Sequence, residues 1–459
     1  MTVYFDDSLP KLTEIIAKEF GSQALLDGVA LRDISGRLCF YLSTPLDEAN
    51  GARLTEILIQ KLGRYARLDR VVAGAADFGV RAALQSADII TVDVKGTPVR
   101  LIDRRLVGAD WLRTPVVPTE GAPRLVFASL KGGVGRSTAL AVVAAHAASR
   151  GHRILAVDLD MEAPGLGAML LNGATTPLFG MIDALVERSL GPLDATFVRD
   201  LVGASTLSSR GRVDVIPAFG ARSLANPADI LSKIGRAYGE VVHEDGSIDT
   251  ILDQVANIIR LAENASRYDL VLVDARAGLH EVAAAALVGL GAEIFCFGID
   301  EPQTFQGYRA LFSHMDRYAR SDVAEKEWLS RVSLVQAKAP QDAELRSEFA
   351  RKCRKMLVGE DVLSDEHPFQ VPLPDGFSDV SWDETVTDDD LGLTESGSTT
   401  DVLSIMYDSN FANFEPLKKH DQASEAVYRK AFGALLDYVE EAVSRGIGSG
   451  VSRRGGAPH

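Results

Sequence analysis

A glycine-rich turn carries the most specific chemistry in this sequence. Residues 129–138 read Ser-Leu-Lys-Gly-Gly-Val-Gly-Arg-Ser-Thr, between an apolar run at 124–128 and an Ala/Val-rich helical stretch at 139–149. Backbone N–H groups of such a turn, together with the N-terminus of the following helix, bind phosphate oxygens. The pattern predicts a nucleoside triphosphate site. It meets the usual G-x-x-x-x-G-K-[ST] motif only in part, because Leu130 stands at the first glycine position and Arg136 at the lysine position.

Two apolar runs that end in aspartate follow the turn. Residues 154–160 read Ile-Leu-Ala-Val-Asp-Leu-Asp and end in Asp160, and residues 268–274 read Tyr-Asp-Leu-Val-Leu-Val-Asp and end in Asp274. The second run has the form of a Walker B strand, in which Asp274 would hold Mg²⁺ through water beside the Ser137 hydroxyl. A single strand ending in Asp is a weak signal, since many such carboxylates only cap turns. The glycine-rich turn followed by both strands, in this order, is a much more specific signal.

The lysine early in the turn, Lys131, narrows the family. Residues 131–138 resemble the deviant Walker A motif, K-G-G-x-G-K-[ST], of the ParA/MinD group of dimeric P-loop ATPases, with Arg136 as the one departure. The resemblance implies an ATP and Mg²⁺ site in which Lys131 reaches the nucleotide of a second subunit and Asp160 positions the attacking water. It also implies that Ser137, Asp274 and Asp160 surround the metal. The loop residues assigned to the nucleotide are Gly132, Gly133, Val134, Gly135, Arg136, Ser137 and Thr138.

Two further segments depart from the family pattern. MinD-like proteins have Pro in switch II where this chain has Arg276, which would contact phosphate or a partner subunit, or else lie on the surface. Family members usually place an Asn near the base after a late strand, whereas this chain reads Gln-Ala-Lys-Ala-Pro at 336–340. ATP is therefore what the resemblance implies, and another purine nucleotide stays open.

Arg136 bears directly on the expected activity. Arginine supplies positive charge through a larger planar fork than the usual lysine, so nucleotide binding should survive. Phosphoryl transfer depends on positioning and charge stabilisation, so a displaced cation slows hydrolysis by orders of magnitude. We expect a slow ATPase that dimerises with nucleotide and responds to an unidentified protein partner. The alternative is a nucleotide-locked scaffold with negligible hydrolysis. A transferase of the same superfamily is less favoured, because the C-terminal segment lacks the tyrosine cluster of bacterial tyrosine kinases.

These residues require an α/β fold to position them. Apolar strands alternating with helices predict a mostly parallel sheet with helices on both faces, and ligands in such folds bind at the carboxyl ends of strands. We place this P-loop ATPase domain at 124–445. A small α+β N-terminal domain at 1–112 would precede it, with a hairpin turn at Lys95-Gly96, and the Pro-rich stretch 113–123 would be a linker.

Composition limits the other classes. The 459 residues carry a net charge of −16, but the segment 360–401 alone holds 13 acidic residues and no Lys or Arg. Because most of the surplus of 64 acidic over 48 basic residues lies there, charge does not exclude nucleic-acid binding, and no motif indicates it. Three widely spaced cysteines without C-x-x-C, no signal peptide and no membrane span predict a cytoplasmic protein.

The C-terminal third adds two expectations. The acidic segment 360–401 reads as a long insert, either solvated or docked on a basic partner. Residues 424–443 form an amphipathic helix whose polar face mixes acids and bases, so we expect it to pack on its own domain and not on a membrane. Residues 446–459 read as a flexible tail. The sequence does not choose among partition, positioning of a cell-surface machine and anti-phage defence.

Overall fold

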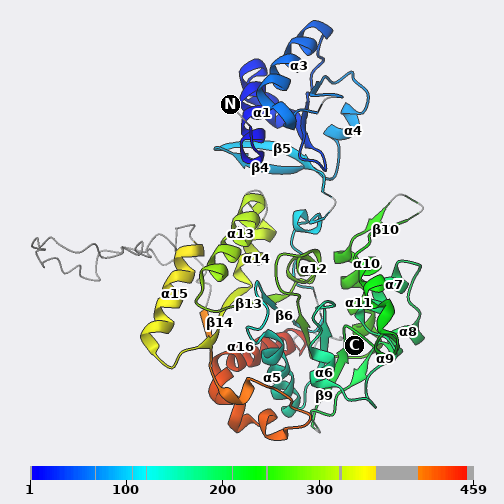
Figure 1. The fold of residues 1–459 in the computed structure, drawn as a ribbon, viewed down its shortest axis with the longest axis vertical. Coiled ribbons are helices and arrows are strands. Elements are labelled where there is room, and N and C mark those ends of the chain that lie inside the picture. The colour runs from blue at the N-terminus through cyan, green and yellow to red at the C-terminus, as the bar shows by residue number, and fades with distance from the viewer. Residues whose placement is uncertain are drawn as a thin grey trace, which may run out of the picture.

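The computed structural model describes residues 3–451, except 68, 106, 120, 209, 244, 246, 320–322 and 358–401; the side chains of 317–326 and 445–451 are also left undescribed. The predicted acidic insert 360–401 thus lies outside the described residues. Within them, the chain forms one large sheet and one smaller N-terminal sheet, with helices packed on both (Figure 1). Among the described helices, none is both long and apolar enough to cross a membrane.

The larger sheet confirms the predicted mostly parallel α/β fold. Its eight described strands lie in the order β15-β14-β13-β6-β12-β7-β9-β8. All neighbouring pairs are parallel except β8 with β9, which is antiparallel. Their bounds are β6 Arg124–Ser129, β7 Arg153–Asp158, β8 Gly203–Ala204, β9 Arg212–Ile216, β12 Leu270–Asp274, β13 Glu293–Gly298, β14 Val332–Ala339 and β15 Val402–Met406.

Helices cover both faces of this sheet because its strands are apolar throughout. Along β6, Leu125 and Phe127 pack in one buried cluster, and Val126 and Ala128 in the other. The first face is covered by α5 (Arg136–Ser149), α6 (Leu166–Leu170) and α16 (Glu425–Val451). The second is covered by α7 (Met181–Arg188), α11 (Ile251–Ala265), α12 (Glu281–Gly289), α13 (Pro302–Ala319), α14 (Val323–Ser330) and α15 (Ala343–Leu357).

Several short elements lie along the chain between β7 and β12. They include the helices α8 (Ala195–Asp200), α9 (Ala221–Ala225) and α10 (Ile230–Ala237). A small antiparallel hairpin of β10 (Val241–Val242) and β11 (Ile248–Asp249) leads into α11. These elements place Tyr238, which follows α10, beside residues of the loops that follow β7 and β12.

The N-terminal unit has its own sheet, in the order β3-β2-β1-β5-β4, and its own buried cluster. Its elements are α1 Phe5–Phe20, α2 Gln23–Asp27, β1 Val29–Arg32, β2 Leu38–Tyr41, α3 Glu48–Leu62, β3 Val72–Ala73, α4 Val80–Leu84, β4 Ile90–Val94 and β5 Thr97–Asp103. The predicted hairpin forms, with Val94 paired to Thr97 across Lys95-Gly96. Strand β4 lies against α13 of the larger unit (Figure 1).

The segment that joins the two units is bound to the larger one. A short 3-10 helix at Asp110–Leu112 places the Asp110 carboxylate 2.9 Å from the backbone nitrogen of Leu252, at the start of α11. Glu281, the first residue of α12, accepts hydrogen bonds from the backbone N–H groups of Gly108 and Asp110. Part of the joining segment is therefore held in place, while the predicted domain boundaries remain predictions.

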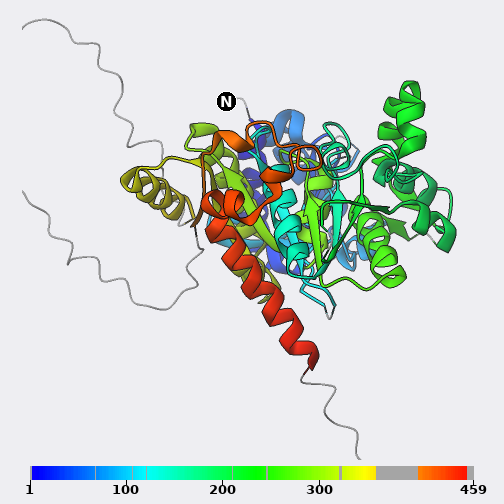
Figure 2. The same ribbon diagram turned by 90° about the horizontal axis from the view of Figure 1, so that it is seen from below.

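The C-terminal helix differs in length from its prediction. Helix α16 packs on α5 and β15, as expected of a helix that belongs to its own domain. It runs from Glu425 to Val451 and extends away from the sheet (Figure 2). The predicted tail at 446–459 is therefore wrong in its first residues, because helical hydrogen bonding continues through the glycines there; residues 452–459 lie outside the described part. All three cysteines, Cys39, Cys296 and Cys353, are buried and free.

Candidate functional site

The glycine-rich turn joins β6 to α5, as predicted. Gly133 and Gly135 adopt left-handed backbone conformations, with φ of 75° and 88°. A Cβ at either position would meet no other atom within 4 Å, so the backbone conformation and not crowding calls for glycine. The buried Val134 side chain anchors the loop between them.

Arg136, the departure from the motif, binds the two carboxylates assigned to catalysis. Its side chain is buried, with the residue 7% exposed. Nη2 donates to Oδ2 of Asp160 at 3.0 Å, Nη1 donates to the Ser129 hydroxyl at 3.2 Å, and Nε donates to Oδ1 of Asp274. One guanidinium thereby bridges carboxylates at the ends of two neighbouring strands. The usual lysine carries a compact ammonium in place of this planar fork, so it would not span the three groups with the same geometry.

Ser137 and Asp274 also lie together. The Ser137 hydroxyl donates to Oδ2 of Asp274 at 2.5 Å. Burial raises the pKa of Asp274, and this outweighs the lowering by the Arg136 charge and by the hydrogen bonds from Ser137 and Arg136. The cluster therefore holds a buried carboxylate whose charge depends on the cation beside it.

A third carboxylate, Asp158, shapes the loop after β7. Its two oxygens accept backbone N–H bonds from Asp160, Gly165 and Leu166 at 3.0–3.1 Å. Burial, and then the neighbouring Asp274, raise the pKa of Asp158. The sequence pattern assigned a site role to Asp160 alone. The structure shows that Asp158 fixes the loop that carries Asp160, a role that only loop geometry could reveal.

Lys131 pairs with a carboxylate outside this cluster. Its ammonium lies 2.7 Å from the carboxylate of Glu301, which follows β13, and both side chains are exposed. The role of Lys131 at a second subunit remains a prediction. Thr138 lies in the first turn of α5, and its assignment to the nucleotide likewise remains a prediction.

Arg276 ties together the loops after β12 and β7. Its guanidinium pairs with Glu162, and the Tyr238 hydroxyl donates to the same carboxylate at 3.2 Å. The ring of His280 lies against Tyr238, with centroids 4.9 Å apart. In this structure Arg276 contacts a neighbouring loop of its own chain. The other two roles considered for it, contact with a phosphate and contact with a partner subunit, remain predictions.

Lys338 contacts the glycine-rich loop, and the sequence analysis did not assign it to the site. It lies near the end of β14, in the segment where an Asn was sought, and its ammonium is 2.8 Å from the carbonyl oxygen of Gly133. The residue is exposed and has a left-handed φ of 53°. Its approach to the loop depends on strand order, because β14 is separated from β6 by β13. The sequence alone offers no signal for that.

The residues at this edge suit Mg²⁺. A hydroxyl and carboxylates are the hard oxygen donors that Mg²⁺ takes, and this ion keeps several waters and binds phosphate oxygens in addition. Among the described residues no group of three or more His, Cys, Asp or Glu could hold a metal alone. Ser137 and Asp274 would therefore supply the protein's share of a site that a bound triphosphate completes.

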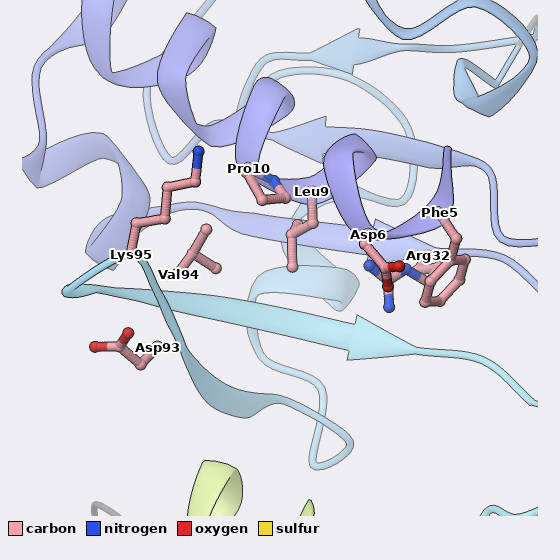
Figure 3. Close-up of a pocket in the computed structure, with 8 residues that line it drawn as sticks. All are labelled: Phe5, Asp6, Leu9, Pro10, Arg32, Asp93, Val94 and Lys95. Carbon is pink, nitrogen blue, oxygen red and sulfur yellow. The ribbon is translucent and has the colours of Figure 1, made fainter. Parts of the chain in front are cut away.

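A separate small hollow lies in the N-terminal unit (Figure 3). The Arg32 guanidinium lies 4.3 Å from the centre of the Phe5 ring at one end of it, and Lys95 lies toward the other end. The lining residues are Phe5, Asp6, Leu9, Pro10, Arg32, Asp93, Val94 and Lys95. Both acidic and basic side chains line this hollow, so the hollow lacks the uniformly positive charge of a phosphate-binding site.

Comparison with known proteins agrees with the residue-level result. Residues 125–353 match the sequence model of the family described as "CobQ/CobB/MinD/ParA nucleotide binding domain". No curated protein matches the chain.

Several solved structures match the chain at low sequence identity. A ParA family ATPase from Chlorobium tepidum TLS has 16% identity and a TM-score of 0.42, covering 69% of this chain and 98% of its own. An ATP complex of a Cyanothece McdA variant has 14% identity and a TM-score of 0.40, covering 71% and 98%. Cobyrinic acid a,c-diamide synthase from Mycobacterium smegmatis, with a bound ATP analogue and magnesium, has 16% identity and a TM-score of 0.33, covering 51% and 82%.

Proposed function

The chain carries a ParA/MinD-like P-loop ATPase domain, and on that premise we propose that it is an ATP-binding switch. In this proposal Mg²⁺ and ATP bind at the loop 131–138, two subunits assemble, slow hydrolysis separates them, and the N-terminal unit transmits the state to a protein partner in the cytoplasm. The proposal rests on one observation: side chains of four residues meet where the loop joins α5. They are Ser137, Asp274, Asp160 and Arg136.

The chain's own residues support nucleotide binding as follows. Loop N–H groups and the N-terminus of α5 would bind the phosphates. Ser137 and Asp274 would hold Mg²⁺, which when bound neutralises charge between phosphate oxygens. Asp160 would orient the attacking water once Arg136 releases it. Because Arg136 now pairs with Asp160 and Asp274, its fork must turn toward the phosphates for the pocket to work.

The same contacts favour the alternative, a nucleotide-locked scaffold. If Arg136 keeps its bonds to the two carboxylates when nucleotide is bound, Asp160 cannot orient water and hydrolysis is negligible. Single-turnover phosphate release separates the two functions. Release that equals the rate of ATP without protein supports the scaffold, and faster release that stops in Asp160→Ala supports the switch.

Dimerisation is tested at Lys131. The lysine is exposed and held by an exposed partner, Glu301, so little free energy opposes its transfer to a second subunit's phosphates. We expect Lys131→Ala to bind ATP but to remain monomeric in chromatography with ATP. Wild type should shift to a dimer with ATP and not with ADP. A mutant that dimerises normally refutes the role of Lys131.

Coupling to the N-terminal unit has a structural route. Helix α12 begins with Glu281, shortly after Arg276, and Glu281 holds the backbone of Gly108 and Asp110. A movement of the loop after β12 would therefore move the segment that joins the two units. Glu281→Gln should weaken that attachment, which protease sensitivity near residue 108 would report with and without ATP.

A further inference from the structure

Lys338 combines an unusual backbone with an unusual contact. Among the described residues, two that are not glycine have left-handed φ, Lys95 at 52° and Lys338 at 53°. The conformation of Lys95 is explained by the two-residue hairpin turn that it forms with Gly96, since such turns need positive φ. Lys338 lies in a strand of the main sheet, at a break in the pairing of β14 with β15 and not in a turn. Strain of this kind persists where the surrounding structure or function demands it.

A β-bulge directs the Lys338 side chain. Gln336 pairs with Ser404 and Ala339 pairs with Met406, so two residues of β14 stand opposite one residue of β15. Bulges of this kind re-aim a side chain. Lys338 is the one exposed residue of β14, whose other residues are buried. The bulge brings its ammonium to the carbonyl of Gly133, 2.8 Å away and two strands distant.

That contact bears on a backbone N–H of the loop. The Gly133 carbonyl and the Val134 N–H belong to one planar trans peptide, so they point in opposite directions. An ammonium on the carbonyl fixes the orientation of the N–H and polarises it as a donor. Ammonium groups have three donors, and the described contacts of Lys338 use one of them.

The charges around the loop make Lys338 distinctive. Lys131 pairs with Glu301, and Arg136 pairs with Asp160 and Asp274. Within the described part of the chain, the ammonium of Lys338 contacts a neutral carbonyl. Among the contacts of the described residues, its positive charge is therefore less compensated by carboxylates than that of the two cations inside the loop.

We propose that Lys338 is a positioning residue for the bound nucleoside triphosphate: it holds the Gly133–Val134 peptide with its N–H toward the phosphates and adds positive charge beside them. This inference rests on the proposed nucleotide-binding function. It assigns a positively charged, phosphate-positioning residue to the end of β14. At this place the family pattern predicted an Asn that contacts the nucleotide base.

The test uses the full chain and two glycine variants. Lys338→Gly removes both the ammonium and the backbone strain, and Lys95→Gly removes equivalent strain far from the loop. We expect Lys338→Gly to weaken MgATP binding about tenfold, the scale of one charge-assisted hydrogen bond, while its melting temperature equals or exceeds that of wild type. Lys95→Gly should gain similar thermal stability and bind MgATP as wild type does. Calorimetric titration and thermal melting give both readouts.

Lys338→Met separates charge from flexibility, because it keeps the strained backbone and the long apolar stem. The inference expects Met and Gly variants to lose similar affinity, with the loss smaller at high salt. MgATP binding unchanged in Lys338→Met overturns it, since flexibility would then account for any effect of glycine. If wild type itself binds neither MgATP nor MgGTP, the proposed function fails instead, so the two failures are distinct.

Discussion

The pairing of Arg136 with Asp274 gives the most direct quantitative prediction. Asp274 is fully buried and Arg136 nearly so. Removing one member of a buried pair leaves an uncompensated charge and costs about 3–5 kcal/mol. At about 1.5 °C per kcal/mol for a domain of this size, Arg136→Met should lower the melting temperature by roughly 4–8 °C. Asp274→Asn should cost less, because Arg136 keeps Asp160 as a partner.

A double-mutant cycle checks the origin of this loss. Arg136→Met with Asp274→Asn removes both charges, so the combined loss should fall short of the sum of the single losses by about 2 kcal/mol. Trp111 and Trp328 are buried in the larger unit, so their fluorescence during urea unfolding reports on it. Additive losses, or an Arg136→Met protein as stable as wild type, would refute the pairing as drawn.

Magnesium without nucleotide supplies an independent readout. In wild type the guanidinium occupies the carboxylates that Mg²⁺ would use. Millimolar Mg²⁺ should therefore leave the wild-type melting temperature unchanged. In Arg136→Met the freed Ser137, Asp274 and Asp160 oxygens can take a Mg²⁺ that keeps most of its waters, so the melting temperature should rise, but by less than it does with MgATP, which completes the site. Calcium at the same ionic strength controls for screening, because its larger size and higher coordination number fit this small donor set less well.

Two further predictions concern the linker and the loop. Burial raises the pKa of Asp110 to about 6 from 3.8, so the folded state holds the proton more tightly. Stability should rise as pH falls from 7 to 4, by up to about 3 kcal/mol relative to Asp110→Asn; parallel pH curves for the two proteins would contradict this. Gly135→Ala places a side chain at a φ of 88°, which costs about 1–2 kcal/mol and distorts the phosphate-binding N–H groups. Calorimetry should detect a loss of MgATP affinity beyond that in Ala139→Gly, a control in the following helix; equal affinity would show that the loop tolerates the change.

The elements of the site were predictable from local sequence, and their contacts were not. The glycine-rich turn, Asp160 and Asp274 each carry a local pattern of strand, turn and helix, and parallel strands bring their carboxyl ends to one edge. The fork of Arg136 on two carboxylates depends on side-chain conformations across three strands. Lys338 depends on strand order and on a bulge. Both are long-range features without a fixed spacing along the chain.

The difference at the C-terminal helix has a local cause. Glycines at 446–450 reduce helix propensity and led to the prediction of a tail, yet α16 continues through them to Val451. Its buried face, which includes Tyr428, Leu435 and Val439, packs in the same cluster as α5, and the backbone remains helical to Val451. Propensity is a weak guide where tertiary packing has already started the helix.

The short antiparallel strand β8 has a consequence for how copies of the chain can meet. It has two residues and ends the sheet beside β9. Edges this short offer few free backbone groups for a foreign strand. Pairing of this edge with the edge of a second copy's sheet, to form one continuous sheet, is therefore disfavoured. Self-association at this edge would have to proceed by side-chain packing.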